Sequence, residues 1–132
     1  MDVAQIALIV LRIILAVAFV GMGATHFVPA VARTMAAMIP PALRRKGLPS
    51  PQALVVITGV CEIAGGLALL SPWQPLRMAA GIALAVFLVA VFPANAYAAR
   101  NRDRFGAAAM PFWPRLLGQA VLIGLVLIAG LG

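Results

Sequence analysis

The sequence has few charged residues and very few acidic ones, and this shortage decides its class. Charged side chains make up 10% of the 132 residues, and only three are acidic. An ordinary soluble domain has about 25%. Apolar residues, counted with Tyr and Cys, make up 64%. So few polar side chains cannot cover a water-facing globule, and so many apolar ones exclude a disordered tail. The composition indicates an integral membrane protein.

Cysteine and histidine each occur once, which limits the available chemistry. Cys61 cannot form an intrachain disulfide or a CxxC redox pair, and we expect it to be a small packing residue. One His and one Cys cannot build a zinc or haem site unaided. The sequence therefore predicts no metal site and no catalytic residue, and it favours a protein that is not an enzyme on its own.

Four apolar runs divide the chain, and each is long enough to cross a bilayer, which takes about 17–25 helical residues. We predict spans over residues 3–28, 51–71, 76–99 and 114–131. Ser50-Pro51 is a typical start for the second, an N-cap followed by proline at the first helical position. The expected fold is all-α, an integral membrane four-helix transmembrane bundle that forms a single domain over residues 1–132.

The connection between the first two spans is long and patterned. Over residues 30–39, a short helix would place Val31, Met35, Met38 and Ile39 on one side. Such a segment could lie on the membrane surface as an interfacial helix or fold back over the mouth of the bundle. An irregular basic loop is equally open.

Basic residues are concentrated in two of the three connections, and this indicates an orientation. The basic side chains do not form the stripe expected of a nucleic-acid-binding protein. Arg77 alone lies beside the connection between the second and third spans. The positive-inside rule places the two basic connections in the cytoplasm and both termini outside, in the cell (inner) membrane. Eight residues carry this argument: Arg33, Arg44, Arg45, Lys46, Arg100, Arg102, Arg104 and Arg115.

Arg12 and Glu62 are charges inside predicted spans, where each costs ~2.5–3.5 kcal/mol. Glu62 lies about 16 Å into its span, and Arg12 lies about 22 Å from the same end of the bundle. Because a long Arg side chain can cover this difference, we predict a buried charge pair, direct or water-bridged. The pair could be a structural contact between helices, and such contacts stabilise membrane proteins by ~0.6 kcal/mol on average. It could equally be part of a ligand or proton site.

A polar vestibule is predicted at the basic end of the bundle, narrowing toward Glu62 and Arg12. Four polar side chains are expected to line this vestibule between apolar walls. They suit an amphipathic ligand such as a quinone or a lipid, because guanidinium and amide groups form hydrogen bonds with a polar head group. The alternative is that the four side chains only satisfy one another and the carbonyl freed by Pro93. The four expected ligand-binding residues are His26, Asn95, Arg115 and Gln119.

Several segments match a known family in order and spacing: GMGATHFVPA at 21–30, MIP at 38–40, GVCEIAGGLALL at 59–70, VFPANAYAA at 91–99 and FWPRLLGQ at 112–119. They resemble the DoxX family of small four-helix membrane proteins. The resemblance implies an association with redox systems, as membrane partners of thiosulfate:quinone oxidoreduction, of sulfur or thiol stress, or of methylamine utilisation. The residues it marks are Arg12, His26, Glu62, Pro93, Asn95, Arg115 and Gln119.

Three functions are consistent with these features. The first is an accessory or anchoring subunit of a membrane redox system, with a redox protein as partner. The alternative is a small proton-coupled transporter of the small multidrug-resistance type. It ranks second because those exporters carry the carboxylate on the first helix, whereas Glu62 is on the second and is expected to pair with Arg12. The third is a site for a lipid or quinone between helices. The lipid bilayer is the expected environment, a homo-oligomer is open, and nucleic acid is not expected.

Overall fold

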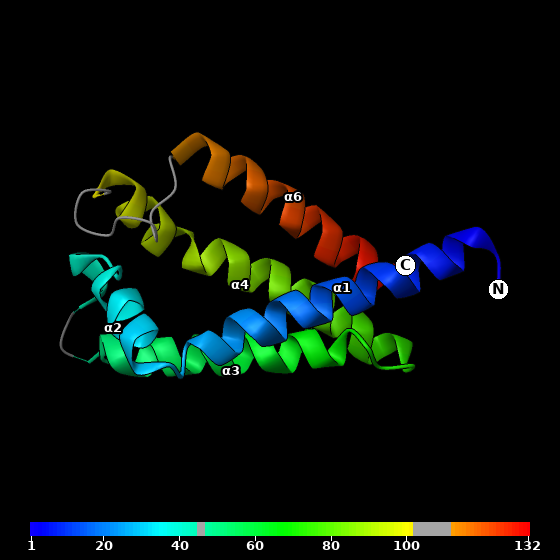
Figure 1. Cartoon of the computed structure of the whole chain (residues 1–132), viewed down its shortest axis with the longest axis horizontal. Helices are drawn as coiled ribbons and strands as arrows, with labels where there is room; N and C mark the ends of the chain where they lie inside the picture. Colours follow the sequence, from blue (N-terminus) through cyan, green and yellow to red (C-terminus); the bar gives the residue numbers. More distant parts are fainter. Residues whose placement is uncertain (45–46, 102–111) are drawn as a thin grey trace.

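The computed structural model describes residues 1–44, 47–101 and 112–132, and over these residues the chain is an all-α bundle (Figure 1). Arg45, Lys46, Arg102 and Arg104, which contribute to the expected orientation, lie outside the described residues. Each long helix has the length and composition to cross a membrane, so the chain is a multi-pass membrane protein in contact with the lipid bilayer. The four long helices are α1 (Val3–Thr25), α3 (Pro51–Ala68), α4 (Gln74–Arg100) and α6 (Phe112–Leu131).

The helices begin at residues that satisfy their free backbone N–H groups. The Asp2 carboxylate accepts from the Gln5 N–H and the Gln5 side chain accepts from the Asp2 N–H, which makes a capping box for α1. Ser50 caps α3 by accepting from the N–H of Ala53, 3.1 Å away, as its position before Pro51 predicts.

The segment after α1 forms a helix. Here α1 ends at Thr25, three residues before the predicted end of the first span, and Pro29 begins a second helix. Proline suits a first helical position and keeps the preceding residue extended. The new helix is α2 (Pro29–Ala37), and a short 3-10 helix, η1 (Pro41–Leu43), follows it.

The long helices associate as two close pairs, α1 with α3 and α4 with α6. Glycines make this approach close in both pairs. A Cβ atom on Gly23 would lie 2.8 Å from the carbonyl oxygen of Gly59, and one on Gly81 would lie 2.8 Å from that of Val126. Small residues are the usual means by which membrane helices approach closely.

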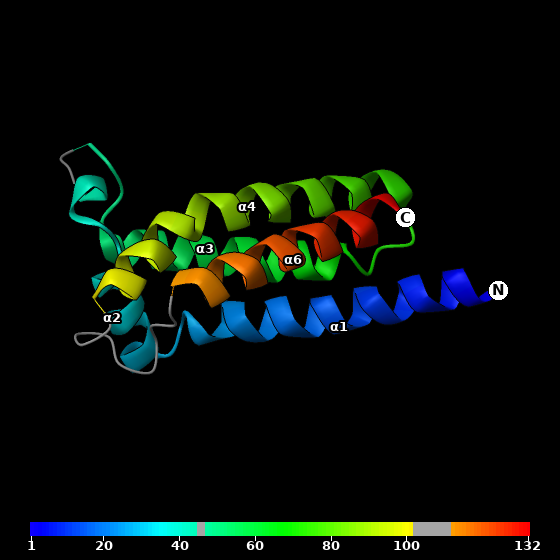
Figure 2. The same cartoon turned by 90° about the horizontal axis from the view of Figure 1, so that it is seen from above.

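The two pairs diverge from one end of the bundle to the other. In Figure 1, α1 and α6 lie close together near the C-terminus and separate toward α2. Both termini lie at the opposite end of the molecule from α2 in Figures 1 and 2. The buried core fills the closed end and takes residues from all four long helices or the turns that follow them. Its buried members are Leu15, Phe19, Leu69, Ala80, Leu84, Leu88, Val126 and Ala129.

Three arginines donate hydrogen bonds to carbonyl groups at helix C-terminal ends. Arg44 donates to three carbonyls at the end of α2, and Arg77 to two in the turn after α3. Arg12 reaches across from α1 to the end of α6, where its Nε and Nη2 donate to the carbonyls of Ala129 (2.9 Å) and Gly132 (3.0 Å). The last carbonyls of a helix have no partner within it, so these contacts satisfy acceptors that the helices themselves leave without a donor.

Candidate functional site

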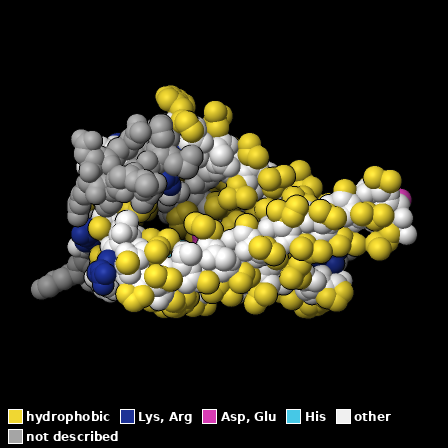
Figure 3. Space-filling view, in the orientation of Figure 1, with side chains coloured by type: hydrophobic (Ala, Val, Ile, Leu, Met, Phe, Trp, Pro, Cys, Tyr) yellow, Lys and Arg dark blue, Asp and Glu magenta, His cyan; other side chains and the backbone are white. Residues whose placement is uncertain are grey.

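A partly open cavity of about 590 Å³ lies between the two helix pairs, on the α2 side of the core. In the space-filling view, the surface is hollowed between α1 and α6 and hydrophobic side chains surround the hollow (Figure 3). All four expected ligand-binding residues, His26, Asn95, Arg115 and Gln119, line this cavity, and so does Glu62. The structure therefore brings together, around one space, side chains from α3, α4, α6 and the end of α1.

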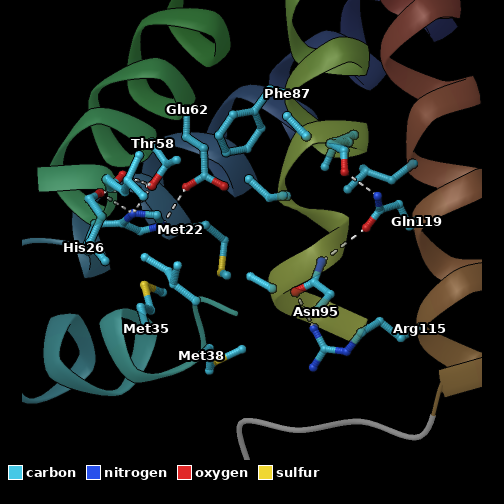
Figure 4. A pocket seen from close by; sticks show the side chains of 18 of the residues that line it. Met22, His26, Met35, Met38, Thr58, Glu62, Phe87, Asn95, Arg115 and Gln119 are labelled. Atoms are coloured by element: carbon cyan, nitrogen blue, oxygen red, sulfur yellow. Dashed lines mark hydrogen bonds and ion pairs between the residues drawn. The ribbon is translucent and has the colours of Figure 1, made fainter. Parts of the chain in front are cut away.

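His26 and Glu62 form a buried pair on one wall of the cavity (Figure 4). His26 Nε2 lies 3.1 Å from Glu62 Oε2, and the two residues are only 8% and 9% exposed. His26 Nδ1 lies 2.8 Å from the carbonyl oxygen of Val55 and 3.1 Å from the Thr58 hydroxyl. In Figure 4 the second carboxylate oxygen of Glu62 points away from His26, toward the space between α3 and α4. One imidazole ring thus links the end of α1 to three positions on α3.

The local sequence explains how His26 reaches α3. His26 is the C-cap of α1, where its backbone N–H donates to the carbonyls of Gly23 and Ala24. A Cβ atom on Gly59 would lie 2.8 Å from the Cβ atom of His26. Only a residue without a side chain at 59 leaves room for the ring between the carbonyl of Val55 and the carboxylate of Glu62.

The hydrogen-bond partners of His26 fix its protonation pattern. A backbone carbonyl only accepts, so Nδ1 carries a proton and donates it to Val55. Nε2 then faces a carboxyl oxygen of Glu62, 3.1 Å away. Contact with Glu62 raises the pKa of His26 above its ordinary value, against burial, which lowers it.

A second polar network lies on the opposite wall and joins α4 to α6. Arg115 Nη1 donates to Asn95 Oδ1 at 2.7 Å, and Asn95 Nδ2 donates to Gln119 Oε1 at 3.2 Å. Gln119 in turn donates to the carbonyl of Leu88. Pro93 has no N–H, so the carbonyl of Val89, the residue after Leu88, lacks its helical donor. The hydrogen bond from Gln119 therefore strengthens α4 close to this point. This network contributes to packing as well as to the lining of the cavity.

The predicted pair between Arg12 and Glu62 is wrong. Glu62 contacts His26, and Arg12 binds the end of α6. The end of α1 lies beside the second turn of α3, where His26 meets Val55. Arg12 precedes His26 by fourteen residues, about 21 Å along a helix, so its level is far from that of Glu62. Glu62 accordingly lines the cavity, and Arg12 does not.

Helix α2 and the residues that follow it close the basic end of the cavity. Met35, Met38 and Ile39, expected on one side of this segment, line the cavity, and Met22 of α1 lies beside them (Figure 4). The segment therefore forms a helix over Pro29–Ala37 and not an irregular loop, and residues of this helix and after it line the cavity. Thioether side chains are flexible and fill irregular space, which suits a wall that adapts to what it contacts.

Two further features differ from the sequence interpretation. Cys61, expected to pack, is exposed on α3. The partners of His26 on α3 were not anticipated, although their spacing gives a signal. Val55, Thr58 and Glu62 recur at intervals of three and four residues, which places them on one helix face.

The site can therefore hold and release one proton at the His26–Glu62 pair, next to a space with mostly apolar walls. The comparisons with known proteins add a family but no activity. No curated protein and no solved structure matches the chain. The family assignment is not to DoxX. A family model matches residues 15–129, which include every residue that lines the cavity. The chain belongs to the family described as Domain of unknown function (DUF8561).

Proposed function

We propose that this protein binds an amphipathic molecule, a quinone or a lipid, in the cavity between its helix pairs, and that it serves a membrane redox system as an accessory subunit. The observation that carries the binding proposal is the cavity of about 590 Å³ itself, where a buried His26–Glu62 pair borders mostly apolar walls. Ligand sites typically combine a largely apolar lining with a few polar groups that orient the ligand.

The shape of the bundle supports access from the lipid. The cavity is lined by Ala18 and Met22 of α1 and by Gly118 of α6, all of which are exposed. These residues belong to α1 and α6, the two helices that diverge toward α2 (Figure 1). An amphipathic molecule dissolved in the bilayer can enter through this gap without crossing water.

The polar groups suit a head group with hydrogen-bonding atoms at opposite edges. On one wall, the pair of His26 and Glu62 can donate a proton or accept one. On the other wall, Asn95, Gln119 and Arg115 supply amide and guanidinium groups. A quinone or its hydroquinone carries oxygens at opposite edges of its ring, and the head group of a lipid also combines donors and acceptors.

The redox part of the proposal comes from the resemblance to DoxX. The three segments with the strongest likeness carry His26, Glu62 and Asn95, and these residues line the cavity from α1, α3 and α4. The likeness thus falls on the residues that would contact the ligand. The redox partner protein is part of the same proposal.

The binding proposal is tested by filling the cavity. At both Gly118 and Gly124 of α6, an added Cβ atom would meet no neighbour within 4 Å, but only Gly118 lines the cavity. We expect Gly118→Leu to lose at least about tenfold of its co-purified quinone or lipid, a change of ~1.4 kcal/mol in binding. Gly124→Leu, the matched control, should retain it. The measurement is mass spectrometry of organic extracts from purified protein.

Equal amounts of the molecule in the two variants and the unmodified protein would contradict the proposal. Arg115→Gln separates binding from packing. We expect it to lower ligand content while the protein stays folded in detergent. A destabilised bundle that has no bound ligand to lose would show that the network of Asn95, Gln119 and Arg115 serves packing alone.

A second function, proton-coupled transport, is favoured by one observation. The carboxylate of Glu62 is paired with a titratable ring and not with the permanently charged Arg12. Such a carboxylate can exchange its proton for an organic cation. Proteoliposomes with an imposed pH gradient should then accumulate tetraphenylphosphonium, and Glu62→Gln should abolish accumulation. Equal uptake with and without the gradient excludes this function.

A further inference from the structure

We propose that a second groove, between α2 and the first turns of α3, binds the head group of an anionic phospholipid of the bilayer. The groove has a volume of about 480 Å³, and its polar lining comes from Arg33, Arg44 and Gln52. Among the described residues, no acidic side chain lines it, and its other lining residues are Ala, Val and Pro. Two guanidinium groups beside a small apolar floor suit a phosphodiester, because Arg33 can donate two parallel hydrogen bonds to phosphate oxygens and Arg44 can donate from its Nη1.

Arg44 is held in place before any ligand arrives. Its Nε donates to the carbonyl of Ile39 at 3.0 Å, and its Nη2 donates to those of Ala36 and Ala37 at 3.1 and 3.0 Å. These three hydrogen bonds do not use Nη1. A fixed guanidinium loses little conformational entropy when it binds, so the contact strengthens at small cost. Arg33, which lies on α2, is exposed and supplies the second charge.

The level of the groove in the membrane favours a lipid over a free anion. Pro51 begins one of the candidate membrane spans and also lines the groove, which places the groove where the apolar part of α3 starts. Gln52, Val56 and Val60 follow at intervals of four residues, and the two valines are 46% and 53% exposed. A phosphate held at Arg33 and Arg44 would thus have its acyl chains along this exposed face of α3. Anionic lipids are attracted to basic segments at this depth.

The experiment compares lipids and variants by native mass spectrometry of the whole protein released from detergent. We expect phosphatidylglycerol to remain bound and phosphatidylcholine, which carries no net charge, to be lost. The double variant Arg33→Gln/Gln52→Ala should retain phosphatidylglycerol about tenfold less than the unmodified protein. Arg100→Gln, which removes an exposed arginine outside the groove, should retain it within about twofold. Arg44 is left unchanged because it also caps α2.

Three outcomes would overturn the proposal. Equal retention of the two lipids would show that head-group charge plays no part. Equal effects of the groove variant and Arg100→Gln would show only general attraction to the basic end. Displacement of phosphatidylglycerol by inorganic phosphate would show an anion site that does not use the lipid face. Gly118→Leu should leave the phosphatidylglycerol of this groove bound even where it empties the cavity, since Gly118 lines the cavity and not the groove.

Discussion

The buried pair of His26 and Glu62 shows how a single residue type can make a carboxylate acceptable inside a membrane protein. The partner that Glu62 contacts is the titratable imidazole of His26 and not a permanently charged guanidinium. The carbonyl of Val55 fixes which ring nitrogen faces the acid. The pair is therefore both a packing contact between α1 and α3 and a place where a proton can be gained or lost.

The raised pKa of His26 predicts how stability depends on pH. The folded protein holds this proton more tightly than the unfolded chain, whose imidazole titrates near about 6.5. The stabilisation is therefore fully present below that value and is lost as pH rises through the higher pKa of the folded state. We expect the melting temperature in detergent to fall over this range. In His26→Gln this part of the pH dependence should disappear, and an unchanged profile would contradict the assignment.

Gly59 is predicted to be the least replaceable residue of the site. Gly59→Ala puts a Cβ atom 2.8 Å from that of His26, and overpacking of this kind costs ~1–3 kcal/mol. Gly21→Ala is the control, because its Cβ atom meets nothing within 4 Å and alanine gains about 0.5–1 kcal/mol in a helix. Thermal unfolding should shift in opposite directions. A similar shift in both variants would mean that α1 and α3 separate readily.

Among the helices, the contact of Arg12 with the end of α6 is the link that joins the two pairs at the closed end. It satisfies two carbonyl groups that have no donor within α6. A charged side chain in an apolar helix is thus accounted for by hydrogen bonds to the end of a neighbouring helix. The same use of arginine at the end of α2 shows that this is a general device in the chain.

This arrangement predicts that Arg12 and Glu62 act independently. Arg12→Met should lower stability by ~1–3 kcal/mol, the usual value of hydrogen bonds to a charged group. Combined with Glu62→Leu, the two losses should add to within about 0.5 kcal/mol, since the two residues share no partner. Chemical unfolding of the two single variants and the double variant gives the comparison. Recovery of stability in the double variant would show that Arg12 and Glu62 form the direct pair that the sequence suggested.

For the molecule as a whole, the sequence was sufficient for the architecture and for the location of four polar side chains around one cavity. Hydropathy and proline positions predicted the helices, and depth along them predicted that His26, Asn95, Arg115 and Gln119 would line one space. The contact between His26 and Glu62 was not predictable, because it depends on the position of α1 along the axis of α3. Gly23, Gly59 and the early end of α1 set this relative position, and the periodicity of one helix does not contain it.

The orientation in the membrane remains a proposal, with the α2 end in the cytoplasm and both termini outside. The structure places the termini together and opposite α2 (Figure 2). In a Cys61→Ala background, we expect Asp2→Cys to react with an impermeant maleimide added to spheroplasts. Arg100→Cys should react only after the membrane is opened. The reverse pattern would place the cavity mouth on the outer side.

The polar contacts hold the bundle together at different places along its length. Hydrogen bonds join the helices of each pair beside the cavity, and Arg12 joins α1 to α6 at the opposite end. Between these contacts, the cavity wall includes the side chains of Met22, Met35 and Met38, which adjust their shape at little cost. Under the proposed binding function, such a cavity would select its occupant by the chemistry of the head group and tolerate tails of different bulk.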